Sequence, residues 1–97
     1  MAAEFHPLDR NQIITVGKSH VAFWTLDQNG TLYKRMGVFD SRDKPKYITC
    51  IAFSQAGEPI TGDSNGNIIV WGRGTNTISR LFKLVNNPNI NKVNMSN

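Results

Sequence analysis

The sequence predicts an all-β protein built from about two four-stranded antiparallel units. Apolar residues occur in short runs that are rich in Ile, Val, Phe, Tyr and Trp, and Gly, Asn, Asp and Pro interrupt these runs. That pattern is typical of strands joined by tight turns. The 97-residue chain also repeats itself, because its two Trp residues, Trp24 and Trp71, lie 47 positions apart in similar surroundings. Every connection is too short for a crossover helix, so the strands should pair antiparallel.

The strands are expected in two consecutive sets. The first set is predicted at 12–16, 20–26 and 31–38, with the inner strand of that unit only partly present, and the second at 47–53, 58–62, 67–71 and 77–84. Asn29-Gly30 and Asn65-Gly66 are two-residue hairpin signals, because both residue types tolerate the positive φ of a type I′ turn. Gln55-Ala56-Gly57 predicts a further turn between the first two strands of the second set.

The repeat itself indicates the architecture. The first unit opens at Phe5-His6-Pro7 and continues through Gly17 to Trp24, and the second opens at Phe53-Ser54-Gln55 and continues through Gly62 to Trp71. Four short strands with a Trp ending the third are typical of a β-propeller blade of about 40–45 residues. We therefore expect blades at 1–40 and 41–85, followed by a disordered Asn-rich tail at 86–97. Propellers typically close with about 4–8 blades, so the predicted ring is incomplete and the rest of a propeller is an expected partner.

Composition excludes several classes of protein. Hydrophobic residues make up 39% and charged residues 19% of the chain, which is globular rather than disordered composition. The single cysteine, Cys50, excludes an internal disulfide framework and favours a reducing compartment. No apolar run approaches the length of a membrane span, and the N-terminal residues do not resemble a signal peptide. The net charge of +4 is compatible with an acidic protein partner, and neither nucleic acid nor a membrane is expected as a partner.

The second unit resembles the WD-repeat consensus over Thr61–Trp71. That resemblance implies a hydrogen-bonded network of Trp, Ser/Thr, Asp and His within each blade. Here Asn65 stands where the Asp is expected, and the Trp-Asp dipeptide is missing because Gly72 follows Trp71 and Thr25 follows Trp24. We therefore expect the network to be incomplete in both units. Apolar packing should hold the second blade instead, through Phe53, Ile60, Ile68, Val70 and Trp71.

Several motifs in order together resemble the echinoderm microtubule-associated protein-like family. They are Gly17-Lys18-Ser19-His20, Phe23-Trp24-Thr25-Leu26, Lys44-Pro45-Lys46, Thr61-Gly62-Asp63-Ser64 and Trp71-Gly72-Arg73-Gly74-Thr75-Asn76, and the resemblance covers about residues 4–80. It implies a slice of an atypical WD-type propeller, with microtubules and tubulin as partners and a location on the cytoskeleton in the cytoplasm. The coiled coil, basic linker and hydrophobic motif that precede the propellers of that family are not found in this sequence.

The candidate partner-binding residues are basic. Lys34, Arg35, Arg42, Lys44 and Lys46 lie within 13 residues that also hold Asp40 and Asp43. One interpretation is a salt-sensitive contact for an acidic tubulin surface. The other is a solvated loop between blades, whose charges keep a strand edge soluble. Two further interpretations of the whole chain stay open: a general WD-type scaffold that docks another protein, and a truncated fragment without independent function.

Catalytic, cofactor and metal sites are not expected. His20 with Ser19 or Cys50 lacks the Gly-x-Ser-x-Gly elbow of a hydrolase, and Cys50 alternates with Ile48 and Ala52 as a small buried residue would. His6, which precedes Pro7, is interpreted as a turn residue. One Cys and two distant His residues do not make a zinc site. The predicted function is therefore a non-catalytic protein-interaction module.

Overall fold

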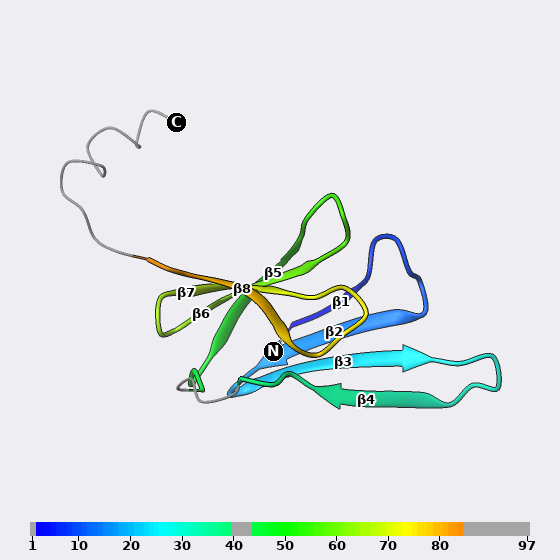
Figure 1. Cartoon of the computed structure of the whole chain (residues 1–97). Coiled ribbons are helices and arrows are strands. Elements are labelled where there is room, and N and C mark those ends of the chain that lie inside the picture. The colour runs from blue at the N-terminus through cyan, green and yellow to red at the C-terminus, as the bar shows by residue number, and fades with distance from the viewer. Residues whose placement is uncertain (1, 40–43, 85–97) are drawn as a thin grey trace.

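The computed structural model describes residues 2–39 and 44–84, which form two four-stranded antiparallel sheets (Figure 1). The first sheet holds β1 (Ala2–Phe5), β2 (Gln12–Gly17), β3 (His20–Leu26) and β4 (Leu32–Met36). The second sheet holds β5 (Ile48–Phe53), β6 (Pro59–Asp63), β7 (Asn67–Trp71) and β8 (Ile78–Lys83). Both sheets have the strands in chain order, so each is a simple meander. The predicted all-β, antiparallel blade architecture with an incomplete ring is confirmed.

The turn between β3 and β4 determines where these two strands end and begin. Asp27 fixes the β3–β4 turn, because its carboxylate Oδ1 accepts the backbone N–H groups of Asn29 at 2.9 Å and Thr31 at 2.8 Å. Gly30 then adopts a φ of +82°, which a residue with a side chain rarely adopts. The inner strand β1 is four residues long and pairs along its whole length with β2, from Ala2 opposite Val16 to Phe5 opposite Ile13.

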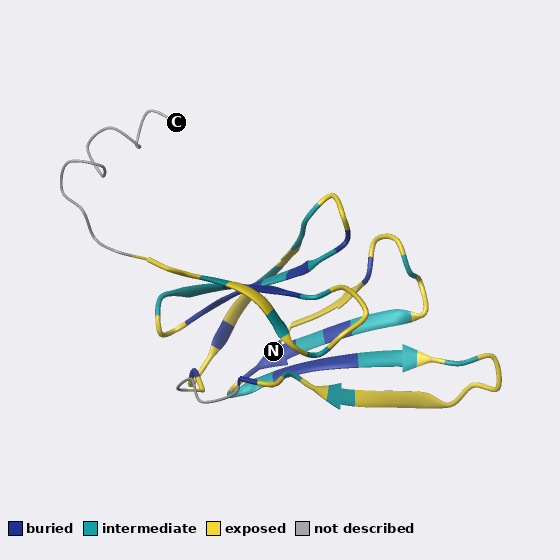
Figure 2. Ribbon diagram, in the orientation of Figure 1, coloured by how far each residue is buried: buried dark blue, intermediate teal, exposed yellow. Residues whose placement is uncertain are grey.

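The hydrophobic core lies between the two sheets (Figure 2). The first sheet contributes alternate residues of its two middle strands, which therefore point to the same face. The core comprises Ile14, Val16, Val21, Phe23, Phe39, Ile48, Ile69 and Trp71, with Ile51, Phe53, Ile78 and Leu81 packed around it. The middle strands carry most of the buried residues, whereas the outer strand β4 is mostly exposed.

Trp71 is the centre of this core. It is fully buried, and its ring makes edge contacts with Phe23 and Phe39, each with centroids 5.4 Å apart. Gly37 makes room for it, because a Cβ built there would lie 2.8 Å from the Trp71 ring carbon Cη2. The Trp71 indole of the second sheet therefore packs against Gly37, the residue that follows β4 of the first sheet.

Two packing predictions for the second sheet are wrong. Cys50 is exposed, because the register between β5 and β6 shifts between Ile48 and Cys50 and so changes which residues of β5 face the core. Ile60 and Ile68 do not join the core around Trp71. They alternate with Thr61 and Ile69, which face the first sheet, so they lie on the opposite face.

Two predicted features lie outside the described residues. The boundary between the predicted units, at residues 40 and 41, falls in the range 40–43, and the predicted tail at 86–97 falls in the range 85–97. The division of the chain into 1–40, 41–85 and 86–97 therefore stays a prediction.

Candidate protein-interaction surface

The segment Lys46-Tyr47 joins the two sheets at one edge. On the side of the first sheet, the Ser19 backbone N–H donates to the Lys46 carbonyl at 2.7 Å, and Lys18 forms a bridge with Tyr47. On the side of the second sheet, the Tyr47 N–H donates to the Ser64 hydroxyl at 3.0 Å, and the Ser64 N–H donates to the Tyr47 carbonyl at 2.9 Å. The connection between the sheets is therefore fixed against the β2–β3 turn and the β6–β7 turn.

Both turns have a local physical cause. Gly17 and His20 pair across a two-residue turn in which Ser19 has a φ of +49°. In the second turn Gly66 has a φ of +78°, and the Asp63 carboxylate Oδ1 accepts the N–H groups of Asn65 at 2.9 Å and Asn67 at 3.2 Å. Asp63, rather than Asn65, therefore supplies the carboxylate that holds this turn.

Three lysines lie on the two segments that meet at this edge, which we call the basic edge: Lys18, Lys44 and Lys46. All three are exposed, whereas Pro45 between the last two is fully buried and anchors their segment. The Lys46 ammonium lies 5.5 Å from the centroid of the Tyr47 ring, which is 46% exposed. An exposed aromatic ring among lysines is a surface that fits an acidic protein partner.

The structure does not bring all five predicted basic residues together. Lys34 and Arg35 are neighbours on β4, so they point to opposite faces of the first sheet. The Lys34 ammonium lies 5.3 Å from the Trp24 ring centroid, whereas Arg35 donates from Nη1 to the Gly74 carbonyl at 3.1 Å. Arg42 lies outside the described residues. Lys18 joins the basic edge instead, and its distance in sequence from Lys44 is the reason that a search for local charge clusters missed it.

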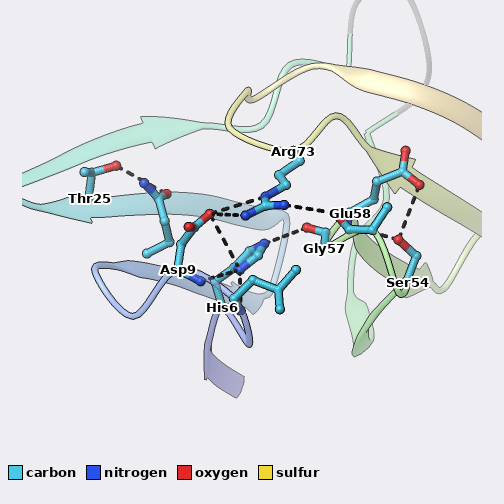
Figure 3. Close-up of polar contacts among 10 residues, drawn as sticks. His6, Asp9, Thr25, Ser54, Gly57, Glu58 and Arg73 are labelled. Carbon is cyan, nitrogen blue, oxygen red and sulfur yellow. Dashed lines mark hydrogen bonds and ion pairs between the residues drawn. The ribbon is translucent and has the colours of Figure 1, made fainter.

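The opposite edge holds the sheets together through His6 (Figure 3). Its Nδ1 accepts the backbone N–H groups of Leu8 and Asp9, both at 3.0 Å. Since Nδ1 accepts, Nε2 carries the proton and donates to the Gly57 carbonyl of the second sheet at 2.6 Å. His6 is thus a buried turn residue, as the sequence indicated, and it is also a link between the sheets.

An exposed ion pair lies beside this link. Arg73 donates to the Asp9 carboxylate Oδ2 from Nη2 at 3.0 Å and from Nε at 3.3 Å, and from Nη1 to the Ala56 carbonyl at 3.3 Å (Figure 3). Gly57 is required here, because it has a φ of +83° and a Cβ built on it would lie 2.9 Å from the His6 ring carbon Cε1. Arg73 and Gly57 of the second sheet thus contact Asp9 and His6 of the first sheet and help to hold the two sheets together.

The tryptophan network differs between the two sheets. In the first sheet the Trp24 indole N–H donates to the Thr15 hydroxyl at 2.9 Å, and that hydroxyl lies 2.7 Å from His20 Nε2. In the second sheet Trp71 donates to the Thr61 hydroxyl at 3.0 Å. In the first sheet a histidine, His20 of β3, is thus connected to the tryptophan through the Thr15 hydroxyl. Gly62, next to Thr61, packs closely against Cys50. A Cβ built on Gly62 would lie 2.7 Å from the Cys50 Sγ, so the position has no room for a side chain.

Within residues 2–39 and 44–84, no group of three or more His, Cys, Asp and Glu side chains could hold a metal ion. The same ranges contain no helix long and apolar enough to cross a membrane. His20 lies in the first sheet and bonds Thr15, whereas Cys50 lies in the second sheet. His20 therefore has a hydrogen-bond partner within its own sheet, the Thr15 hydroxyl.

Comparisons with known proteins agree with these features. The family model described as "Echinoderm microtubule-associated protein first beta-propeller" matches residues 1–97. The chain is 58% identical to mouse echinoderm microtubule-associated protein-like 1 over 78 residues, or 80% of this chain and 10% of that protein. It is 50% identical to the human echinoderm microtubule-associated protein-like 2 over 80 residues, and 48% identical over 80 residues to a 77 kDa echinoderm microtubule-associated protein of Strongylocentrotus purpuratus. In both cases the match covers 82% of this chain and 12% of the relative.

The chain therefore spans about a tenth of the length of the curated relatives it matches. The match to the family model covers both sheets, both tryptophans and the turns that form the basic edge. This chain belongs to the echinoderm microtubule-associated protein family and corresponds to part of its first β-propeller.

Proposed function

We propose that this chain is a non-catalytic interaction module that contributes to microtubule and tubulin binding through the basic edge. The observation that carries the proposal is the Lys46 ammonium over the exposed ring of Tyr47, with Lys18 bridged to Tyr47 through the backbone and the exposed Lys44 two residues before Lys46. The names of the relatives supply the partner, since they are microtubule-associated proteins. A cytoplasmic location on microtubules follows from the same proposal.

The physical role of the basic edge would be attraction and orientation of an acidic surface. Exposed charges contribute mainly to association rate and salt dependence, and each contributes about 0.2–1 kcal/mol to a contact. The backbone bonds of Lys46-Tyr47 hold the backbone of this segment in place before binding, which lowers the backbone entropy lost on association. Of the other predicted contact residues, Lys34 and Arg35 lie away from this edge, so we assign them a smaller part.

Co-sedimentation of the chain with assembled microtubules tests the proposal. Reversing Lys18, Lys44 and Lys46 to Glu should weaken binding by about tenfold or more, since about 1.4 kcal/mol corresponds to tenfold. Arg10→Glu is the control for a single charge reversal away from the basic edge, to be compared with Lys46→Glu alone, because Arg10 is exposed in the β1–β2 connection at the opposite edge. Its binding should stay close to that of the unchanged chain, and added salt should weaken binding of both.

Two results would count against the proposal. Equal binding by the triple variant and the unchanged chain would remove the basic edge from the contact. Failure of the unchanged, folded chain to bind microtubules would remove tubulin binding from this chain and favour a scaffold that docks another protein. Competition between tubulin and such a captured protein would then separate the two functions.

A further inference from the structure

His6 is a buried titratable side chain at the contact between the two sheets, and the basic edge does not involve it. It is 4% exposed, and its ring makes an edge contact with the Phe53 ring of the second sheet at a centroid distance of 5.3 Å. Nδ1 accepts the N–H groups of Leu8 and Asp9, and Nε2 donates to the Gly57 carbonyl. A ring held in this way is a neutral imidazole with its proton on Nε2.

A second proton on this ring would remove its acceptor. Both nitrogens of an imidazolium are donors, so the new N–H at Nδ1 would face the N–H groups of Leu8 and Asp9, whose nitrogen atoms lie 3.0 Å away. The ring could then keep its bond to Gly57 only if the turn that carries it changed shape. Burial adds to the cost, because a charged ring at this site has little contact with water.

The charged groups beside His6 offset an added positive charge only in part. In its own turn, Asp9 Oδ2 lies 3.9 Å from Nδ1 and would attract an imidazolium. The same oxygen already accepts from Arg73 of the β7–β8 turn at 3.0 Å, and that guanidinium would repel the ring. In the β5–β6 turn, Glu58 pairs with Arg80 at 3.5 Å (Figure 3 shows Glu58 beside this site). Both carboxylates thus already have a cationic partner.

We infer that His6 is a proton-sensitive link, which holds the two blades together at this edge when it is neutral and releases them when it takes up a proton. Its partners in both blades belong to this chain, so the link does not depend on what covers the outer faces of the sheets. At the opposite edge, Ser19 and Ser64 bond Lys46-Tyr47 through backbone and hydroxyl groups, which do not titrate near neutral pH. Protonation should therefore open the molecule as a hinge about that junction.

The direction of the pH dependence follows from the proton count. The released form binds one proton more than the linked form, so the link weakens as the pH falls. Histidine ordinarily ionises between about pH 5 and 8, which is the range in which the link should respond. At most, the ratio of released to linked molecules should rise about tenfold for each pH unit, because one proton is taken up.

His20, the other histidine of the chain, provides an internal comparison. It lies in the first sheet, and its Nε2 is 2.7 Å from the Thr15 hydroxyl, a group that can donate or accept. That hydroxyl can reverse its bond when His20 takes up a proton, whereas the two N–H groups at Nδ1 of His6 can only donate. Of the two histidines, His6 alone should therefore control the contact between the sheets.

Nuclear magnetic resonance of the full chain between about pH 8 and pH 5 tests the inference. At the higher pH, the nitrogen chemical shifts of the ring should identify His6 as the tautomer with its proton on Nε2. As His6 takes up a second proton, the nuclear Overhauser contacts between its ring and the Phe53 ring should disappear with the same midpoint. The contacts of Tyr47 with Ser19 and Ser64 should persist, because the junction at the opposite edge stays bonded.

His6→Asn separates the link from the turn. The Asn side-chain oxygen can accept the N–H groups that follow it in the turn, as Nδ1 does, but Asn has no titrating group and no donor at the position of Nε2. In urea unfolding, the ratio of the unfolding constant of the unchanged chain to that of His6→Asn should rise by up to about tenfold per pH unit as the pH falls. His20→Asn is the matched control and should keep the response that His6→Asn loses.

Three results would overturn the inference. The first is a His6 ring that takes up a proton while its contacts with Phe53 persist. The second is a His6 ring that stays neutral in the folded chain down to about pH 5. The third is an equal response of unfolding to pH in the unchanged chain and in His6→Asn. If His6→Asn loses its dispersed amide spectrum, the first two observations, made on the unchanged chain, decide the matter.

Discussion

Trp24 and Trp71 occupy the same position in the two sheets, yet they have different surroundings. Both lie on the third strand of their sheet, and both donate an indole N–H to a threonine, at 2.9 Å and 3.0 Å. Trp71 is fully buried against the first sheet, whereas Trp24 is half-buried on an outer face with Lys34 over its ring. The comparison shows that the bond from indole to threonine forms within a single sheet, whereas the burial of Trp71 depends on packing against the neighbouring sheet.

The largest expected effect is that of removing the buried indole. Trp71→Ala should destabilise the chain by about 3–5 kcal/mol, because it leaves a large cavity between the sheets. Trp24→Ala should cost less than about 2 kcal/mol in the monomer, since part of that side chain already contacts water. Urea unfolding of both variants, measured at a concentration at which the chain is monomeric, checks the difference. Equal losses would show that the two indoles contribute alike and that the core between the sheets matters less than its burial implies.

An intermediate effect is expected at Gly37. Gly37→Ala should cost about 1–3 kcal/mol, because its Cβ would lie 2.8 Å from Trp71 Cη2 and 3.3 Å from Val21 Cβ. The same change should cost less in a Trp71→Phe background, where the smaller ring leaves space for the added methyl group. A double-mutant cycle measures this coupling. Additive costs would place the strain of Gly37→Ala somewhere other than Trp71.

Effects of similar or smaller size are expected at the two threonines, and they test the hydrogen bond itself. Thr61→Val should cost about 1–3 kcal/mol, because it leaves the buried indole N–H of Trp71 without an acceptor. Thr15→Val should cost less than about 1 kcal/mol, since the half-buried Trp24 can donate to water instead. Midpoints of urea unfolding give both values. A larger loss for Thr15→Val than for Thr61→Val would mean that the contact of Thr15 with His20 contributes more to stability than the buried bond between Trp71 and Thr61.

Sequence patterns predicted the strands well because alternation and turn residues are local signals. The strands His20–Leu26 and Asn67–Trp71 were predicted with the ends that the structure shows, and five others differ by one or two residues at an end. The strand β1 (Ala2–Phe5) was not among the predicted strands, since the inner strand of that unit was expected to be only partly present. Faces were harder to predict. A register shift near Ile48 reversed the expectation for Cys50, and no local pattern signals such a shift.

The candidate site was predicted less well, because it depends on residues far apart in the chain. Lys44 and Lys46 were found as a charge cluster, but Lys18 joins them only through the bridge to Tyr47. Adjacent positions on a strand separate Lys34 from Arg35, although they look like one cluster in the sequence. His6 was assigned to a turn, but its bond to Gly57, 51 residues away, needs the packed sheets.

The bonds around Lys46-Tyr47 have a consequence for measuring motion in this molecule. The amide protons of Ser19, Tyr47 and Ser64 are all held at the junction of the two sheets. Their exchange with deuterium would accelerate when the sheets part, even while the ladders inside each sheet stay closed. Comparing these three amides with those at the centres of β3 and β7 therefore separates hinge opening between blades from unfolding of a blade. The same three signals would report whether a partner at the basic edge locks the hinge.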